Sequence, residues 1–158
     1  MTGVRRLAAW LYATAGLTYL VDRFTKLWAE RALAGRPPLT VIPGVLQLNY
    51  TTNSGGAFGL GQSAPWVFAA ATILVAAAIV ASSFRLRNGP TAVALGLILG
   101  GAFGNLTDRA ARGDGLLSGR VVDFIDFHVW PVFNVADSAI VIGAVLLAMG
   151  GIRREREA

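Results

Sequence analysis

The chain has 158 residues, of which 54% are hydrophobic and only 15% are charged. A water-soluble domain has about 25% charged residues, so the composition favours a membrane protein and argues against a soluble enzyme. The net charge of +5 is not gathered into a basic run with interleaved aromatic residues, and there is no cysteine. We therefore expect no nucleic-acid partner, and disulfides and thiolate metal sites are excluded.

The first apolar stretch, residues 7–21, follows Arg5 and Arg6 and precedes Ala-Leu-Ala at 32–34, as in a cleavable signal peptide. Against cleavage, five charged residues separate this stretch from the supposed cleavage site. They are Asp22, Arg23, Lys26, Glu30 and Arg31. We therefore interpret residues 7–27 as a membrane span that the protein retains.

Three further apolar stretches follow at residues 65–84, 91–109 and 132–152. A helix needs about 20 residues to cross the hydrocarbon of a bilayer, and each stretch is close to that length. Four spans in so short a chain leave room for a single domain, residues 1–158. The sequence thus predicts an all-α membrane protein, a bundle of four transmembrane helices.

Two loops, residues 28–64 and 110–131, connect the spans. Residues 39–50 alternate in polarity and contain the turn signal Pro43-Gly44, which predicts a hairpin or a short sheet lying over the membrane. Residues 120–127 alternate more weakly, like an extended segment. Asp123 would then come from a strand in a loop, and Asp137 from the start of a helix.

Four spans place both termini on the same side of the membrane. Basic residues divide evenly, with seven on each side, so their number does not decide the orientation. The first span usually dominates, and Arg5 and Arg6 lie immediately before it. We therefore expect both termini in the cytoplasm and both long loops outside it.

Polar residues on three different spans lie at the same depth in the membrane. Asp22, Asn105 and Asp137 each lie 16 residues from the residue taken as the cytoplasmic end of their helix. At about 1.5 Å per residue this is about 24 Å into a hydrocarbon layer about 30 Å thick. Polar groups are costly at that depth, so a functional site is predicted near the extracytoplasmic face.

Asp123 and Asp137 are the candidate catalytic residues. Two carboxylates sharing a site cannot both ionise cheaply, so one keeps a proton while the other takes a proton from water. The structural alternative is that Asp137 caps its helix and Asp123 is a solvated loop residue. Asn134 lies one turn before Asp137 and either orients that carboxylate, holds substrate or caps the helix. Asp126 competes for the acid role but is expected to face solvent.

Other polar residues near the extracytoplasmic ends of the spans also have two interpretations. Asn105, Asp108 and Arg109 can form a polar brace, or Arg109 simply pairs with Asp108 as an ion pair at the membrane interface. Asp22 and Lys26 have the spacing of an ordinary helical salt bridge.

Four other interpretations explain less of the sequence. Ser54, in the glycine-rich residues 53–59, could form a Ser–Lys dyad with Lys26, the only lysine. His128 is the only histidine, so a metal site would have to consist of carboxylates and one histidine, which is a weak indication of metal binding. We therefore expect no metal and no cofactor. A proton channel or transporter would need polar residues deep in the spans, whose cytoplasmic halves are almost wholly apolar. A purely structural protein would leave the clustered polar motifs unexplained.

Five polar motifs follow one another along the chain. They are residues 22–26 (DRFTK), 53–58 (NSGGAF), 100–109 (GGAFGNLTDR), 121–124 (VVDF) and 133–137 (FNVAD). In this order, and with four spans, the sequence resembles lipoprotein signal peptidase (signal peptidase II), a family of bacterial membrane aspartic peptidases. The motifs extend from the first span to the last, but the stretch between Asp123 and Asp137 is shorter than in many relatives.

The resemblance implies cleavage of diacylglyceryl-modified prolipoproteins on the N-terminal side of the lipidated cysteine, without a metal or cofactor. It implies a catalytic dyad of Asp123 and Asp137, supported by seven residues that bind substrate or brace the dyad. They are Asp22, Lys26, Asn53, Asn105, Asp108, Arg109 and Asn134. The family fold is a four-helix membrane bundle with a small extracytoplasmic β-sheet. We expect a monomer in the bacterial inner membrane, with prolipoproteins and membrane lipids as its partners.

Overall fold

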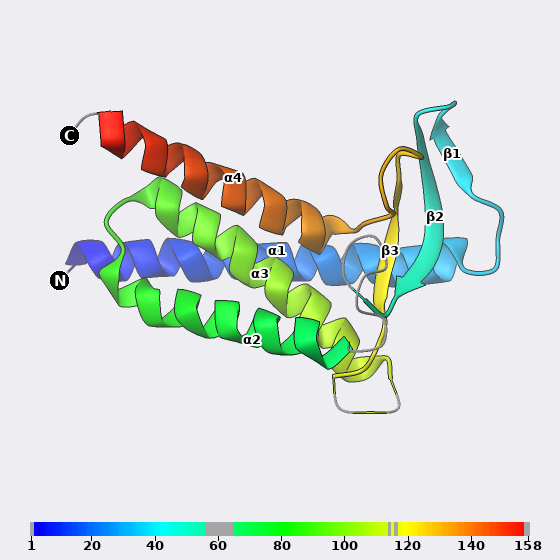
Figure 1. Ribbon diagram of the computed structural model, residues 1–158, viewed down its shortest axis with the longest axis horizontal. Coiled ribbons are helices and arrows are strands. Elements are labelled where there is room, and N and C mark those ends of the chain that lie inside the picture. Colours follow the sequence, from blue (N-terminus) through cyan, green and yellow to red (C-terminus); the bar gives the residue numbers. More distant parts are fainter. Residues whose placement is uncertain (1, 56–64, 114, 116, 157–158) are drawn as a thin grey trace.

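The computed structural model describes residues 2–55, 65–113, 115 and 117–156. Its helices are α1 (Thr2–Leu33), α2 (Pro65–Ser82), the 3-10 turn η2 (Ser83–Arg85), α3 (Gly89–Ala111) and α4 (Val135–Arg156). The α-helices lie lengthwise beside one another, and a small sheet crosses one end of the bundle (Figure 1). Both termini and the α2–α3 connection lie at the opposite end (Figure 1). The predicted helical bundle with a small sheet is confirmed.

Helix α3 lies at the centre of the bundle and contacts α1, α2 and α4. Glycines make the closest of these contacts possible. A Cβ on Gly96 would lie 2.6 Å from the Leu11 carbonyl oxygen of α1, and one on Gly101 would lie 2.5 Å from the Ala136 carbonyl oxygen of α4. The stripe of small residues on α3 therefore lets three helix backbones approach closely.

We expect Gly100→Ala to destabilise the bundle, although alanine is the better helix former. The new Cβ would overlap the Ala15 carbonyl oxygen and lie 2.7 Å from the Thr18 Cβ, so α1 and α3 would have to separate. The expected cost is about 1–3 kcal/mol, as for overpacking generally. Thermal unfolding in detergent measures it, and Gly16→Ala is the matched control, because nothing lies within 4 Å of a Cβ there. Equal melting temperatures for the two variants would contradict this packing.

The sheet consists of β1 (Leu39–Ile42), β2 (Leu46–Asn53) and β3 (Val121–Asp126), antiparallel and in that order. The hairpin turns at Gly44, which has a φ of +73°, and Val45 N–H donates to the Ile42 carbonyl at 3.0 Å. The predicted hairpin and extended segment are thus both confirmed.

Strand β3 is mostly buried, whereas β1 is exposed along its length. The reason is that the last turns of α1 continue beneath the sheet, where Ala29 and Leu33 form an apolar cluster with Phe124. This packing holds β3, and with it Asp123, against the end of the bundle. It also explains why α1 extends past residue 27, the predicted end of the first span.

In the described part of the chain, Trp66–Arg85 and Gly89–Ala111 are long and apolar enough to cross a membrane by length and composition. Helix α4 has a shorter apolar stretch, Val135–Gly150. Helix α4 begins three residues after the start of the fourth apolar stretch at residue 132. Phe133 pairs with Ile125 as an isolated β-bridge, so the chain becomes helical only at Val135.

Candidate active site

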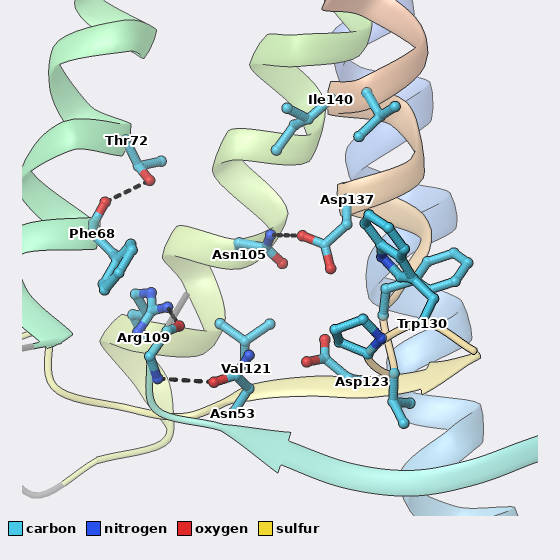
Figure 2. Close-up of a pocket in the computed structure, with 15 residues that line it drawn as sticks. Asn53, Phe68, Thr72, Asn105, Arg109, Val121, Asp123, Trp130, Asp137 and Ile140 are labelled. Carbon is cyan, nitrogen blue, oxygen red and sulfur yellow. Dashed lines mark hydrogen bonds between the residues drawn. The ribbon is translucent and has the colours of Figure 1, made fainter. Parts of the chain in front are cut away.

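Two carboxylates from different elements project toward one cavity near the sheet end of the bundle. Asp123 comes from the middle of β3 and Asp137 from the first turn of α4 (Figure 2). Both line the cavity, which has a volume of about 330 Å³. Its other walls combine polar groups with apolar side chains. They include Asn53, Asn105, Arg109, Phe68, Trp130 and Ile140.

Asp137 is held by the start of its own helix. Asp137 N–H donates to Asn134 Oδ1 at 2.9 Å, and Asn134 N–H donates to Asp137 Oδ2 at 3.3 Å. This reciprocal pair is a capping-box arrangement, which satisfies two backbone donors that the first helical turn leaves open. Asp137 therefore does cap its helix, and the same hydrogen bonds orient its carboxylate toward the cavity.

Asp123 is only 3% exposed, although it carries a carboxyl group. Asn134 Nδ2 donates to its Oδ1 at 2.7 Å, and Asn53 also hydrogen-bonds it. Burial, and after it the neighbouring Asp137 carboxylate, raise the pKa of Asp123 to about 7 against the opposing effects of the amide donors and the Lys26 charge. The interpretation of Asp123 as a solvated loop residue is therefore wrong.

A fully buried lysine lies behind the two carboxylates. Lys26 Nζ contacts Asp22 Oδ2 at 2.9 Å and Asp108 Oδ2 at 3.0 Å, and it donates to Asn105 Oδ1 at 2.8 Å. Asn105 Nδ2 in turn donates to Asp137 Oδ1 at 2.8 Å (Figure 2). Three acceptors surround the three protons of the ammonium group, so Lys26 is not placed to act as a base for Ser54.

The two acidic partners of Lys26 each hold one of the elements that carry the dyad. Asp22 Oδ1 accepts from Ala136 N–H at the start of α4, at 2.9 Å. Asp108 Oδ2 accepts from Val122 N–H in β3, at 3.3 Å. The Asp22–Lys26–Asp108 cluster therefore fixes where α4 and β3 lie relative to each other.

Arg109 does not pair with Asp108, so that expectation is wrong. Its guanidinium donates to the Ser54 carbonyl at 3.1 Å and to the Gly55 carbonyl at 2.7 Å, and it lies 5.8 Å from the Phe68 ring centroid. Arg109 thus holds the end of β2, where Asn53 lies, against α3. The glycine-rich residues beyond Gly55, including residues 56–59, fall outside the described residues.

Comparison with known proteins agrees with this geometry. The model of the family described as signal peptidase (SPase) II matches residues 14–153. The chain belongs to this family. A lipoprotein signal peptidase of Syntrophomonas wolfei is 42% identical over 147 residues, covering 90% of this chain and 95% of the relative. One of Rhodococcus jostii is 39% identical over 149 residues, covering 94% of this chain and 74% of the relative.

Solved structures share the family's fold. Two are described as bacterial membrane enzyme structures obtained by the in meso method, at 2.3 and 1.9 Å resolution. The first has a TM-score of 0.78 and 28% identity, and covers 90% of this chain and 87% of its own. The second has a TM-score of 0.74 and 30% identity, and covers 89% of this chain and 90% of its own.

All nine predicted site residues of this family member lie in one connected region. Asp123, Asp137, Asn53, Asn105 and Arg109 line the cavity. The remaining four lie behind it as supports. They are Asp22, Lys26, Asp108 and Asn134.

Two arginines that were not predicted from the sequence as site residues also support the site. Arg23 Nη1 contacts Asp108 Oδ1 at 2.5 Å, and Arg112 Nε contacts the same oxygen at 3.0 Å. Arg112 also holds Glu30 with two hydrogen bonds of 2.9 Å each. The four-residue spacing from Asp108 to Arg112 was a usable signal for this pair.

Asp126 does not face solvent as expected. It is 8% exposed, and it accepts from Gln47 Nε2 at 2.7 Å and from His128 N–H at 2.8 Å. These bonds stabilise the turn after β3, and Asp126 is not among the residues that line the cavity. Within the described residues, no three His, Cys, Asp or Glu side chains gather as metal ligands would.

Proposed function

We propose that this protein removes signal peptides from diacylglyceryl-modified prolipoproteins, cutting on the N-terminal side of the lipidated cysteine. The observation that carries the proposal is the meeting of Asp123 and Asp137 at one cavity, with Asn134 donating hydrogen bonds to both carboxylates. One ionised and one protonated carboxyl can activate a water and polarise a peptide carbonyl together. Family membership supports the same reaction.

The cavity suits a substrate of mixed polarity. Phe68 from α2 and Ile140 from α4 provide apolar wall, while Asn53 and Arg109 provide polar groups near the dyad. An apolar signal peptide and its lipid can rest on such walls while the scissile peptide lies among the polar groups.

The proposed setting is the bacterial inner membrane, with one domain of four spans, a monomer and surrounding lipids. Both termini would lie in the cytoplasm and the site near the extracytoplasmic face. Lys26 and Arg109 are buried in the site, so they do not count as charges of the extracytoplasmic loops. Without them, the basic residues are no longer divided evenly between the two sides of the membrane. Exposed arginines remain at the terminal end of the bundle, as the positive-inside rule requires. They include Arg5, Arg6, Arg85 and Arg87.

The test uses purified protein in liposomes with two forms of one prolipoprotein, either diacylglyceryl-modified or unmodified at the cysteine. We expect cleavage of the modified form, with the new N-terminus at the lipidated cysteine as measured by mass spectrometry. Equal cleavage of both forms, or a cut at another bond, would overturn the proposed substrate.

A further inference from the structure

The two carboxylates have unequal surroundings, although Asn134 contacts both. Asp137 is half-buried and lies in the first turn of α4, where the helix dipole favours a negative charge. Asp123 is buried on a strand, which provides only a small dipole. The helix therefore stabilises the ionised form of Asp137 more than that of Asp123.

The second difference between the carboxylates comes from Lys26. An ammonium group can only donate hydrogen bonds, so Lys26, at 2.8 Å, fixes Asn105 with its Oδ1 toward Nζ. Asn134 Nδ2 donates to the same oxygen at the longer distance of 3.3 Å. The Nδ2 of Asn105 must then face Asp137 as a donor, at 2.8 Å. A charge-assisted bond on one side of an amide also polarises the bond on its other side. Asp123, by contrast, receives its hydrogen bonds from the amides of Asn134 and Asn53. The Lys26 charge also attracts the Asp123 carboxylate, but burial opposes its ionisation more strongly.

The other charged groups near the two aspartates do not change which of them ionises more readily. Asp22 on α1 and Asp108 on α3 are both paired with Lys26. Arg109 on α3 interacts electrostatically with both Asp123 and Asp137. Its charge therefore favours ionisation of either one.

We propose that Lys26 is a positioning residue which, through Asn105, fixes Asp137 as the ionised member of the pair, so that Asp123 carries the shared proton. This rests on the proposed peptidase function and assigns each carboxyl its step. The raised pKa of Asp123 agrees with the assignment.

The assignment gives a balanced reaction. The Asp137 carboxylate takes a proton from water, the hydroxide oxygen bonds to the scissile carbonyl carbon, and Asp123 gives its proton to the carbonyl oxygen. In the second step Asp137 protonates the amide nitrogen and the C–N bond breaks with its electron pair going to nitrogen. One diol hydroxyl returns its proton to Asp123, which leaves a carboxylic acid on the signal peptide and restores both aspartates.

The test is the pH dependence of kcat/KM for Asn105→Leu, a variant of similar size that lacks the donor. Removing the donor disfavours the Asp137 carboxylate, so we expect the acidic limb to move to higher pH. The alkaline limb, expected near pH 7 from Asp123, should stay in place. If Asp137 carried the proton instead, the alkaline limb would move and the acidic limb would not, which would overturn the assignment.

A double-mutant cycle tests the route through Asn105. Lys26→Met should also raise the acidic limb, and this effect should vanish in the Asn105→Leu background. The alkaline limb should rise in both backgrounds, because the Lys26 charge acts directly on Asp123. An undiminished effect on the acidic limb in that background would mean that Lys26 acts directly on Asp137 and would overturn its role through the amide. Tyr12→Phe, which removes a hydrogen bond to Ser83 far from the site, is the control and should leave both limbs unchanged.

Infrared spectroscopy provides a readout that depends neither on turnover nor on the folding of Lys26→Met. At about pH 5, below the pKa of Asp123, the protonated-carboxyl band of the pair should be lost in Asp123→Asn and retained in Asp137→Asn. The opposite pattern would overturn the assignment and leave the peptidase function standing. Full cleavage activity in both variants would instead overturn the dyad itself.

Discussion

Asp123→Asn and Asp137→Asn should each lower the rate of prolipoprotein cleavage by at least about 10³-fold, because each removes one member of the acid–base pair. Asparagine has nearly the shape of aspartate but cannot accept or release the proton that each step requires. Single-turnover cleavage in liposomes measures the loss. Binding of an uncleaved substrate should persist, since the apolar walls of the cavity are unchanged.

The fold of both variants should be retained, for reasons that differ between them. Burial disfavours the ionised form of Asp123, so a neutral side chain there removes a cost. At position 137 an amide oxygen can still accept from Asn134 N–H and preserve the cap. Asp126→Asn is the matched control, because it alters the same strand without touching the cavity. A dyad variant that cleaves at the wild-type rate would contradict the assignment.

Lys26→Met should destabilise the protein by about 3–5 kcal/mol, the usual consequence of removing one partner from a buried ion pair. Methionine fills a similar volume, so the loss comes from charge. Asp22 would remain fully buried after losing its ion pair, whereas Asp108 would keep its contacts with Arg23 and Arg112. Chemical unfolding in mixed micelles, followed by tryptophan fluorescence, measures the change.

A double variant separates charge from packing. Adding Asp22→Asn to Lys26→Met removes the carboxylate whose ion pair is lost, while Asp108 keeps its arginines, so much of the lost stability should return. Activity should remain low, because only the longer bond from Asn134 Nδ2, at 3.3 Å, then holds the Asn105 Oδ1. If the double variant is no more stable than Lys26→Met alone, the cluster does not stabilise the fold through its charges.

Much of the fold could be predicted because it depends on local composition. The apolar stretches become helices, and the turn signal Pro43-Gly44 produces the hairpin. Helix rise also predicted that Asp22, Asn105 and Asp137 lie at one depth in the membrane. Hydrogen bonds at this depth connect the three helices that carry them. Helix rise fixes how far along its axis a residue lies, so this inference needed no tertiary information.

Which groups each polar side chain contacts could not be predicted in the same way. Asp108 and Arg109 are neighbours in the sequence, but successive helical residues point in different directions, so their side chains do not face each other. Asp108 joins Lys26, whereas Arg109 reaches the carbonyls of Ser54 and Gly55. Similarly, the residues around Asp126 did not indicate that Gln47, far away in the sequence, would hydrogen-bond the buried Asp126 carboxylate.

The sequence by itself determined that this is a membrane-type helical chain with two aspartates in costly positions and the motifs of a signal peptidase II. Only the tertiary structure decided how β3 and α4 bring Asp123 and Asp137 to one cavity. The reason is distance along the chain: Asp22 accepts from Ala136 N–H, 114 residues away. Such a contact depends on how α1, α3 and α4 pack through their glycines, and no local pattern encodes it.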